Sequence, residues 1–517
     1  MSTDSRSPAS AQSGSFMVLY AEKAERLNAL LEIAKALNAE REIDRLLQMV
    51  VNEAARVVDA DRGTLFLIDV DTGDLWSKIA HGLGGEIRIK RGHGIAGLVA
   101  TTGQVVNLRD AYADSRFNPS VDRTTGYHTQ TLLCVPMRNS RGDVVGVLQL
   151  LNKHDGVFDD DDEDLLQVLG GQAASAVENA LLHEEITKLF EGFVQASVIA
   201  IEARDPTTAG HSERVARLTL GLCDALEGHG TASWQRLEFS HAQRMEIRYA
   251  ALLHDFGKVG VREDVLVKAN KLYPAQLDLL RLRFAYAKKA IEVEHLRDCV
   301  ALFRAGVPAH EIGNYDLAIA EKIAEIDALQ AIVEAANRPT VLAAGSFEAL
   351  SRGAQFEFTG PGGKRQPLID DNEIALLSIP RGSLSLGERR EIESHVSHTF
   401  RFLKQIPWSR GLRRVPEIAH GHHEKLNGQG YPQALAADAI GVEARMMAVA
   451  DIYDALTASD RPYKKAVPHI NALGILDEEA KRGALDHELV SLFRLAKVAE
   501  RVFGPGIADT RRISGVF

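Results

Sequence analysis

The chain has 517 residues, about three domains' worth at roughly 150 residues each, and its 45% hydrophobic content is enough for separate cores. The formal net charge is −11 with Lys and Arg scattered along the chain, so we expect neither a nucleic-acid partner nor an anionic-membrane surface. No apolar run reaches the ~18 residues of a membrane helix, and three widely spaced cysteines (Cys134, Cys223 and Cys299) fit a reducing cytoplasm.

The first part of the chain predicts an α+β domain. Residues 1–19 are polar and Ser-rich, which indicates a disordered tail. Residues 20–182 then combine two helices with short strands that return as hairpins, which favours an antiparallel sheet covered by helices. The elements expected are a helix from Tyr20, a helix over Ile43–Val58, strands over Arg62–Val70, Asp74–His81, Gln130–Asn139 and Val144–Asn152, and a helix from Glu163.

This order of elements, with the glycine-rich Gly92–Gly97 segment, resembles a GAF domain. One pattern also looks like the NKxnFx3DE signature of cyclic-nucleotide-binding GAF domains; its residues are Asn152, Lys153, Phe158, Asp162 and Glu163. The resemblance implies a pocket under the sheet for a cyclic nucleotide or another small ligand, with Asn107–His128 as a candidate lid. Two other interpretations stay open: the signature could be structural, with a Lys153–Asp162 ion pair that clips a loop, and the domain could serve dimerisation alone.

A connector helix is predicted over residues 164–203, overlapping both domains. Its apolar residues recur near heptad spacing from Leu166 to Ala196, interrupted at Gly170-Gly171. Such a stripe is typical of helix pairing, so we expect a homodimer formed through the connector.

The rest of the chain is mostly helical by pattern and carries metal-ligating residue types. His254 and Asp255 end the expected helix Met245–Phe256, and neighbouring side chains there diverge by about 100°, so Asp255 could bridge two ions. Further candidates are His211, His395 on Glu391–Leu403, His422 and His423 on Val415–His423, and Asp451 on Ala444–Leu456. Histidines and carboxylates without a thiolate favour iron or manganese over a structural zinc site.

Five segments resemble, in order, the HD-GYP phosphodiesterases of the HD superfamily: DPTTAGHSERV, LLHDFGKVGV, ESHV, HHEKLNGQGYP and AVADIYDALTASDRPYK. The resemblance implies an all-α domain over residues 190–517 with two divalent metal ions. Some members have a glutamate where this chain has Thr207, and that glutamate binds a third metal ion. The metal-binding positions that match are His211, His254, Asp255, His395, His422, His423 and Asp451.

The activity implied is hydrolysis of cyclic di-GMP to pGpG, GMP or both, regulated by the GAF domain. Asp255 and Lys258 match catalytic positions, and Lys258, Tyr431, Arg461 and Lys464 match substrate-contacting positions. The metals would activate water for attack on phosphorus, while Lys258, on the same helical face as His254, would offset phosphate charge. Two alternatives stay open: an HD-type phosphohydrolase for another cyclic nucleotide, and a non-catalytic scaffold that binds a nucleotide or a diguanylate cyclase-type partner.

Two departures from the family pattern qualify this prediction. Asn427 stands where the family usually has Asp, which keeps the turn-forming tendency but removes a charge. About a hundred additional residues, over about 274–384, precede the His395 helix. We expect a helical insertion there, with helices over Pro274–Arg304 and Asp316–Asn337 and a loose connection over Gly353–Gly387.

Overall fold

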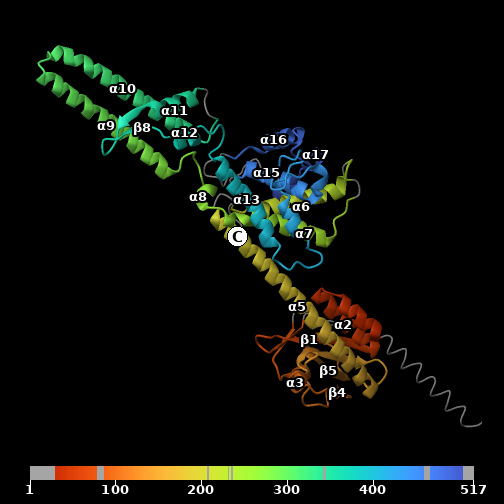
Figure 1. Ribbon diagram of the computed structural model, residues 1–517. Helices are drawn as coiled ribbons and strands as arrows, with labels where there is room; N and C mark the ends of the chain where they lie inside the picture. The colour runs from red at the N-terminus through yellow and green to blue at the C-terminus, as the bar shows by residue number, and fades with distance from the viewer. Residues whose placement is uncertain are drawn as a thin grey trace, which may run out of the picture. The chain divides into compact units, whose positions relative to one another are not determined.

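The computed structural model describes residues 30–77, 87–205, 209–230, 232–234, 237–341, 345–458 and 466–504 (Figure 1). The chain divides into two compact units, Met1–Glu191 and Gly192–Phe517, and each is described by itself. The predicted tail over residues 1–19 lies outside the described residues.

The first unit is built on a six-stranded antiparallel sheet. The strand order is β3-β2-β1-β6-β5-β4, so the long central pair β1 and β6 joins the two predicted hairpins. The partner predicted over Asp74–His81 is a strand only from Leu75 to Ser77 within the described residues. The strands are β1 Ala60–Ile68, β2 Leu75–Ser77, β3 Ile87–Ile89, β4 Val106–Leu108, β5 Leu132–Arg138 and β6 Val144–Lys153.

Apolar residues of the central strands point alternately to the two faces of this sheet, and each face packs into a separate core. Leu65 and Leu67 join the core beneath the helix at residues 30–39, α2 (Ile43–Val57) and α5 (Asp160–Arg204). Phe66, between them, joins the core beneath α3 (Gly94–Thr102). This period of two is what a strand covered on both faces requires. The predicted lid over Asn107–His128 is not a plain loop, because it contains the end of β4 and the helix α4 (Ser120–Thr125).

The predicted connector is one continuous helix, α5, which Gly170-Gly171 does not interrupt. The stripe predicted to pair two copies has two different environments. Leu166, Leu169, Ala173, Ala176, Val177 and Ala180 are buried in the core of their own unit. Only later members such as Ile186 and Leu189 are exposed, at 63% and 77%. The first half of the stripe is therefore intramolecular core, and pairing through the connector remains a prediction that concerns the second half.

The second unit is a helical domain, and several of its helices begin at capping residues. Ser240 with Gln243 and Ser385 with Glu388 form capping boxes at the starts of α7 and α13, and Asp486 caps α17. The elements outside the insertion are α6 His211–His229, α7 His241–Leu253, η2 Phe256–Gly260, α8 Glu263–Leu266, α13 Leu386–Leu403, α14 Val415–His420, η3 Ala437–Ala439, α15 Val442–Thr457, α16 His469–Lys481, α17 His487–Leu495 and α18 Val498–Phe503.

The insertion is a small α/β module. Helices α9 and α10 form a long antiparallel pair (Figure 1), and α10 begins at Ala309, earlier than the predicted Asp316. The loose connection predicted over Gly353–Gly387 is wrong, because this stretch buries Phe358, Leu368, Ile369 and Leu377 against the helical pair. Its elements are α9 Pro274–Arg304, α10 Ala309–Ala336, α11 Ser346–Gln355, β7 Glu357–Thr359, β8 Arg365–Pro367 and α12 Asp371–Leu377.

The two ends of this module meet. Lys271, fully buried, donates from Nζ to the carbonyl oxygen of Leu377 at 2.8 Å. Asn337 accepts from the amide nitrogens of Lys271 at 2.9 Å and Leu272 at 2.8 Å. Chain entry and chain exit are thus joined at the base of the helical pair.

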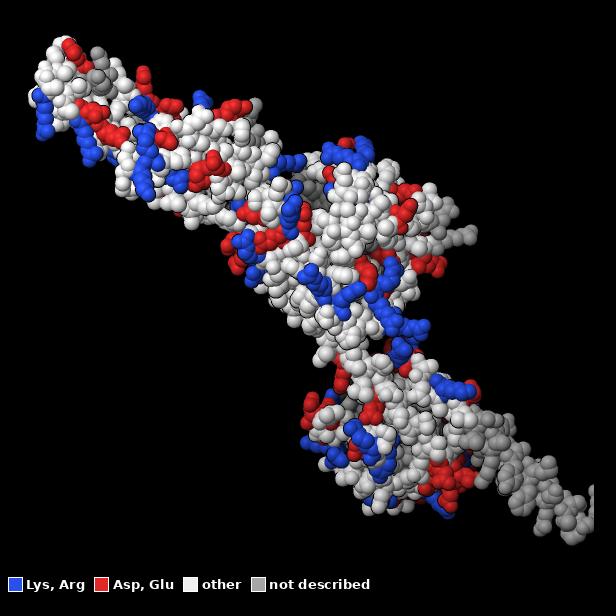
Figure 2. Space-filling model, viewed as in Figure 1, with Lys and Arg blue, Asp and Glu red and all other residues white. Residues whose placement is uncertain are grey.

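Three further features concern the helices, the cysteines and the surface charge. Within the described part of the chain, none of the helices combines the length and apolar content that a membrane crossing needs. The three cysteines are free thiols, with Cys134 and Cys223 buried. On the face that Figure 2 shows, Lys and Arg are interspersed with Asp and Glu, so neither sign of charge dominates it.

Candidate metal centre

The first half of the centre is a tight turn that follows α7. Helix α7 ends at Leu253, His254 is its C-cap, and Asp255 precedes the short helix η2, which contains Lys258. The prediction of one helix through Phe256 is therefore wrong, and the same-face argument for His254 and Lys258 does not hold. Lys258 reaches the centre by a different route, since its Nζ lies 2.8 Å from Oδ2 of Asp255.

Gly257 and Thr399 hold this turn against α13. The Thr399 hydroxyl donates to the His254 carbonyl oxygen at 2.9 Å and accepts from the Gly257 amide at 2.8 Å. A Cβ on Gly257 would lie 1.9 Å from the carbonyl oxygen of His395, closer than any side chain allows. Glycine is thus required for the close approach that brings His254 and Asp255 to His395.

The second half is another turn, after α14. The helix predicted through His423 ends at His420, and residues 421–423 form a turn. Adjacent side chains on a regular helix diverge by about 100°. In this turn the rings of His422 and His423 lie with their centroids 4.0 Å apart. Leaving the helix therefore lets both neighbours face the centre.

All seven predicted ligands converge. Asp255 lies between two sets of donors: its Oδ2 is 3.7 Å from Nε2 of His211 and 3.5 Å from Nε2 of His254, and its Oδ1 is 3.2 Å from Nε2 of His395. A carboxylate so placed can bridge two ions. Within each of three sets the donor atoms lie within 4.8 Å of one another: His211, His254 and Asp451; His395, His422 and His423; His254, Asp255 and His422.

Three of these histidines present a bare ring nitrogen to the centre. The Nε2 atoms of His254, His395 and His422 are buried without a hydrogen-bond partner. Their Nδ1 atoms lie 2.7, 2.6 and 2.6 Å from main-chain carbonyl oxygens three residues earlier, so Nδ1 must donate. The proton is on Nδ1, and the Nε2 lone pair is directed inward. A buried polar atom left unsatisfied costs about 1–3 kcal/mol, which a divalent cation would offset.

The ionisation states also suit cation binding. Burial, with neighbouring histidines, lowers the pKa of His422 well below its usual value, and burial lowers that of His423 to about 4. Both imidazoles are therefore neutral near pH 7, the form that ligates metal. Burial opposes ionisation of Asp255, but Lys258 and the surrounding histidines hold its pKa well below the usual range. The centre thus combines neutral donors with a carboxylate that stays charged.

His211 is the exception. Burial lowers its pKa, but hydrogen bonds with Asp451 and Asp454 outweigh burial and raise it to about 9. Its Nε2 lies 3.2 Å from Oδ1 of Asp451 and its Nδ1 lies 2.8 Å from Oδ2 of Asp454. A proton on Nε2 occupies the position that a cation would take, so cation binding there releases it.

Asp454 and Arg214 support the centre and were not predicted. Arg214 donates to Oδ1 of Asp454 from Nε at 2.7 Å and to Oδ2 from Nη2 at 3.0 Å, while the same carboxylate orients His211. Spacing could have indicated both residues. Asp454 lies three residues after Asp451 on α15, and Arg214 lies three after His211 on α6, so each shares a helical face with a ligand.

The predicted substrate-contacting residues differ in what the structure describes. Lys258 is 14% exposed and lies between Asp255 and Asp205, whose Oδ2 is 3.4 Å from Nζ. The ring of Tyr431 lies 4.7 Å from that of His423 and so borders the centre. Arg461 and Lys464 lie outside the described residues, as does Thr207, on which the expectation of two ions rather than three depends.

The loop after His423 is shaped by its glycines. Gly428 has a φ of +72°, and a Cβ on Gly430 would lie 2.3 Å from the amide nitrogen of Lys425. Asn427 accepts from the Gln429 amide at 3.1 Å and donates to the carbonyl oxygen of Arg482 at 3.3 Å. The amide thus makes a donation that the family's usual Asp could not, and it does so on the exposed side of the loop.

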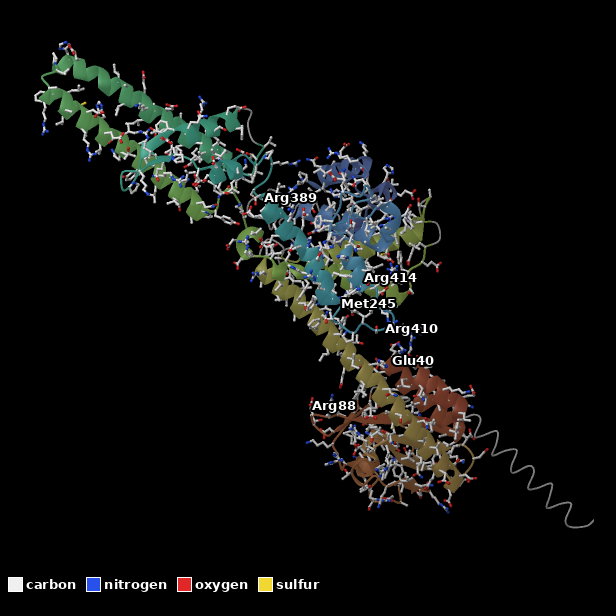
Figure 3. All side chains as sticks on the ribbon, viewed as in Figure 1. Glu40, Arg88, Met245, Arg389, Arg410 and Arg414 are labelled. Atoms are coloured by element: carbon white, nitrogen blue, oxygen red, sulfur yellow. The ribbon has the colours of Figure 1, made fainter. Side chains whose placement is uncertain are left out.

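Arg414 ties the second turn to the helices that carry the other ligands (Figure 3). Its amide donates to Glu246 on α7 at 2.8 Å, and its Nη1 donates to Glu443 on α15 at 2.7 Å. The segment bearing His422 and His423 is therefore fixed to the helices that bear His254 and Asp451.

The first unit has a cavity of about 360 Å³ on the α3 and α4 side of its sheet. Among its lining residues are Arg62, Tyr127 and Arg88, and Arg88, which is labelled in Figure 3, is paired with Asp69 at 3.1 Å. The predicted lid contributes Tyr127 and the residues of α4 to this lining. A pocket lies where the resemblance implied one, but its ligand remains a prediction.

The five signature residues do not line this cavity. Lys153 and Asp162 form a close, largely buried ion pair, and Phe158 is 1% exposed. Asn152 donates to the Tyr127 hydroxyl at 2.9 Å, and Glu163 accepts from Asn107 at 2.8 Å. The contacts are those of a loop clip, and among the described residues Asn152 connects the signature to the cavity lining through Tyr127.

Comparison with known families identifies both domains. The GAF domain family matches residues 42–177, and the HD domain family matches residues 372–489. The chain therefore carries a GAF domain followed by an HD domain. The HD match begins after His211, His254 and Asp255, yet the fold brings these three residues to the ligands that lie within it.

Individual relatives share only part of their length with this chain. It is 39% identical over 175 residues to a probable 3′,5′-cyclic phosphodiesterase of Caenorhabditis elegans, covering 31% of this chain and 24% of that protein. It is 34% identical over 176 residues to a dual 3′,5′-cyclic-AMP and -GMP phosphodiesterase of Takifugu rubripes, covering 31% and 19%. A solved GAF domain from a Coxiella burnetii phosphoenolpyruvate-protein phosphotransferase is 24% identical, covering 31% and 96%, with a TM-score of 0.29. The chain thus spans a quarter or less of these two phosphodiesterases.

Proposed function

We propose that the second unit is a metal-dependent phosphodiesterase for a cyclic nucleotide. One observation carries the proposal: Asp255 lies between two sets of donors, and three buried histidine Nε2 atoms point into the centre without hydrogen-bond partners. A structural site for one ion would need about four ligands around one point. Seven donors divided by a shared carboxylate suit a pair of ions instead.

Each residue has a role in this proposal. His211, His254 and Asp451 would hold one cation and His395, His422 and His423 the other. Asp255 would be common to both, since its two oxygens lie near His211 and His254 on one side and near His395 on the other. Iron or manganese fits the imidazole and carboxylate donors. Two such cations polarise a phosphoryl oxygen and lower the pKa of water toward neutrality.

The neighbouring residues prepare the site for phosphate. Lys258 is held between Asp255 and Asp205, where its ammonium offsets charge that develops on a phosphoryl group beside the centre. Asp454 fixes the orientation of His211, and the Tyr431 ring covers His423 from one side. A phosphodiester at the centre would thus meet the positive charge of the cations and of Lys258, beside the ring of Tyr431.

Two substrate classes follow from different observations. Cyclic di-GMP is supported by the order of the five HD-GYP-like segments, which include both turns of the centre. A 3′,5′-cyclic mononucleotide is supported by the two relatives, which are named as a probable 3′,5′-cyclic phosphodiesterase and a dual 3′,5′-cyclic-AMP and -GMP phosphodiesterase. The proposal at the level of a cyclic nucleotide covers both.

A substrate panel tests the proposal. Purified full-length protein is loaded with Mn²⁺ or Fe²⁺, its metal content is measured, and cyclic di-GMP, cyclic AMP and cyclic GMP are each supplied. We expect metal-dependent hydrolysis of one class, lost in Asp255→Ala and retained in Asp224→Ala, an exposed carboxylate of α6 paired with Arg244. A metal-loaded protein that hydrolyses none of them would contradict the proposal and favour the non-catalytic scaffold.

We also propose that the cavity of the GAF domain regulates turnover. Coupling between two sites is typically worth about 1–3 kcal/mol, or a 5- to 150-fold change. Deleting residues 1–185 should therefore change the rate or its response to added cyclic nucleotide. An unchanged rate with every nucleotide of the panel would leave the domain without this role.

A further inference from the structure

Helix α9 of the insertion has an apolar face that its own module leaves largely uncovered, although the ring of Tyr286 lies 6.0 Å from that of Phe358. Leu280, Phe284 and Ala287 lie on the inner face and are at most 1% exposed. The opposite face carries seven large apolar side chains that are 44% to 71% exposed, here called the outer seam. They are Leu279, Leu282, Tyr286, Val293, Leu296, Val300 and Phe303.

The outer seam follows a strict heptad pattern. From Leu279 to Phe303 the apolar positions alternate in steps of three and four residues, and Lys289 occupies the one remaining position of the series. This is the a and d spacing by which two helices pack knobs into holes. A helix that faced only water would carry polar residues there. On neighbouring α10, by contrast, Leu317 is exposed at 68% outside any such series.

We propose that the outer seam packs against the same seam of a second copy as a parallel, in-register coiled coil. The charges beside the seam select this orientation. With Leu279 at position a, Glu292 occupies g and Arg297 occupies e. The preceding g and e residues, Asp278 and Arg283, are engaged within the module, since Asp278 pairs with Arg281 at 3.3 Å and Arg283 pairs with Glu373 at 2.6 Å. Parallel pairing sets Glu292 against Arg297 of the second copy. Antiparallel pairing would set Glu292 against Glu292 of the second copy, which is repulsive.

The size of the seam is sufficient for such an interface. Seven large apolar side chains that are about half exposed offer on the order of 700 Å² per copy, close to the ~800 Å² each partner buries in a standard interface. Lys289 is the polar member of the series, and Glu292 pairs with it at 2.6 Å. One polar residue within an apolar seam fixes register at a cost in affinity. Lys289→Leu should therefore tighten association.

Sedimentation of the full-length protein with site-specific cross-linking tests the interface. Val300→Cys, in a Cys299→Ala background, should cross-link to its own counterpart under mild oxidation, since Cys134 and Cys223 are buried. Adding Leu296→Glu should abolish the cross-link and raise the dimer dissociation constant at least about tenfold, whereas Leu317→Glu should change neither. The cross-link separates this interface from pairing through α5. The proposal would be overturned by a dimeric protein that does not form the cross-link, or by a protein that stays monomeric at every concentration. If such a monomer bound another protein or lipid vesicles, that partner would be the one that covers the outer seam.

A charge exchange tests the orientation. Arg297→Glu should weaken association, because parallel pairing then opposes two acidic residues, and the double variant Glu292→Arg, Arg297→Glu should recover it. Arg297→Glu that strengthens association would indicate antiparallel pairing and overturn the parallel assignment.

Discussion

Replacing Asp454 with Asn tests whether His211 is held as a metal ligand by a residue outside the ligand set. The Asp454 carboxylate accepts from His211 Nδ1 at 2.8 Å and from two nitrogens of Arg214 at 2.7 and 3.0 Å. An amide has the same shape but must turn its NH₂ group toward one of these donors. If it faces His211, it forces the ring proton from Nδ1 to Nε2, the atom that should ligate.

The size of the effect follows from these contacts. Changes to residues that orient ligands typically lower metal affinity 10- to 100-fold, or about 1.4–2.7 kcal/mol. Stability should fall as well, by about 1–3 kcal/mol, because Arg214 is only 16% exposed and loses a charged acceptor. Titration calorimetry with Mn²⁺ on metal-stripped protein measures the first quantity, and chemical denaturation in the absence of metal measures the second.

Asp486→Asn is the matched control. Asp486 pairs with Arg445 at 3.0 Å in the same unit, is comparably buried and caps α17, a role that Asn also fills. It should lose stability without losing Mn²⁺ affinity. Should Asp454→Asn bind Mn²⁺ as tightly as the parent while losing only stability, the assignment of His211 as a ligand oriented by Asp454 would be refuted.

Three further predictions concern other parts of the second unit. Gly257→Ala should lower the free energy of unfolding by more than about 2 kcal/mol and abolish metal binding, because the added Cβ would collide with the His395 carbonyl oxygen. The control is Gly228→Ala, where the added Cβ would lie in open space on α6. Chemical denaturation should show this variant to be as stable as the parent or slightly more stable. Asn427→Asp should change kcat by no more than about twofold, since a surface change away from the ligands is typically worth at most 0.5 kcal/mol; a large gain in the substrate assay would show that the family's charge matters here. For Glu388, burial opposes ionisation, but Lys268, Ser385 and Tyr273 hold the pKa at about 2, below its usual 4.5. A depressed carboxyl pKa stabilises the fold above about pH 4.5, and this stabilisation is lost as the pH falls toward 2. Glu388→Gln should therefore lower the free energy of unfolding by about 3 kcal/mol at pH 7, and the stability of the variant should fall less steeply than that of the parent between about pH 5 and 3. Identical acid-unfolding profiles of variant and parent would contradict this.

The ligand set could be predicted from sequence because each member lies in a short segment of recognisable composition. The geometry that joins the segments could not. Nothing local indicates that α7 stops at Leu253, since this depends on Thr399, more than a hundred residues later, and on the space beside Gly257. The turn that brings His422 and His423 together could likewise not be predicted, because the sequence pattern there indicates a helix that continues through His423.

The insertion shows a second limit of structure prediction from sequence patterns. Its helices were predicted from periodicity, but Gly353–Gly387 looked irregular because glycines punctuate strands and helices of only a few residues. What orders these short elements is the face of the helical pair against which Phe358 and Leu368 pack. Conversely, half of the connector stripe was misassigned because heptad spacing alone does not distinguish intramolecular core from an intermolecular seam.

The buried contact between Lys271 and Leu377 makes the inserted module a cassette. The entry and exit of the module are joined at one point, so the polypeptide between them forms a closed loop. The entropic cost of closing such a loop rises only slowly with its length, by roughly 0.6 kcal/mol for each doubling. The helical pair can therefore be lengthened, shortened or exchanged in evolution without moving Asp255 relative to His395. An HD domain that tolerates such an exchange can acquire new assembly partners while the arrangement of its candidate metal ligands stays unchanged.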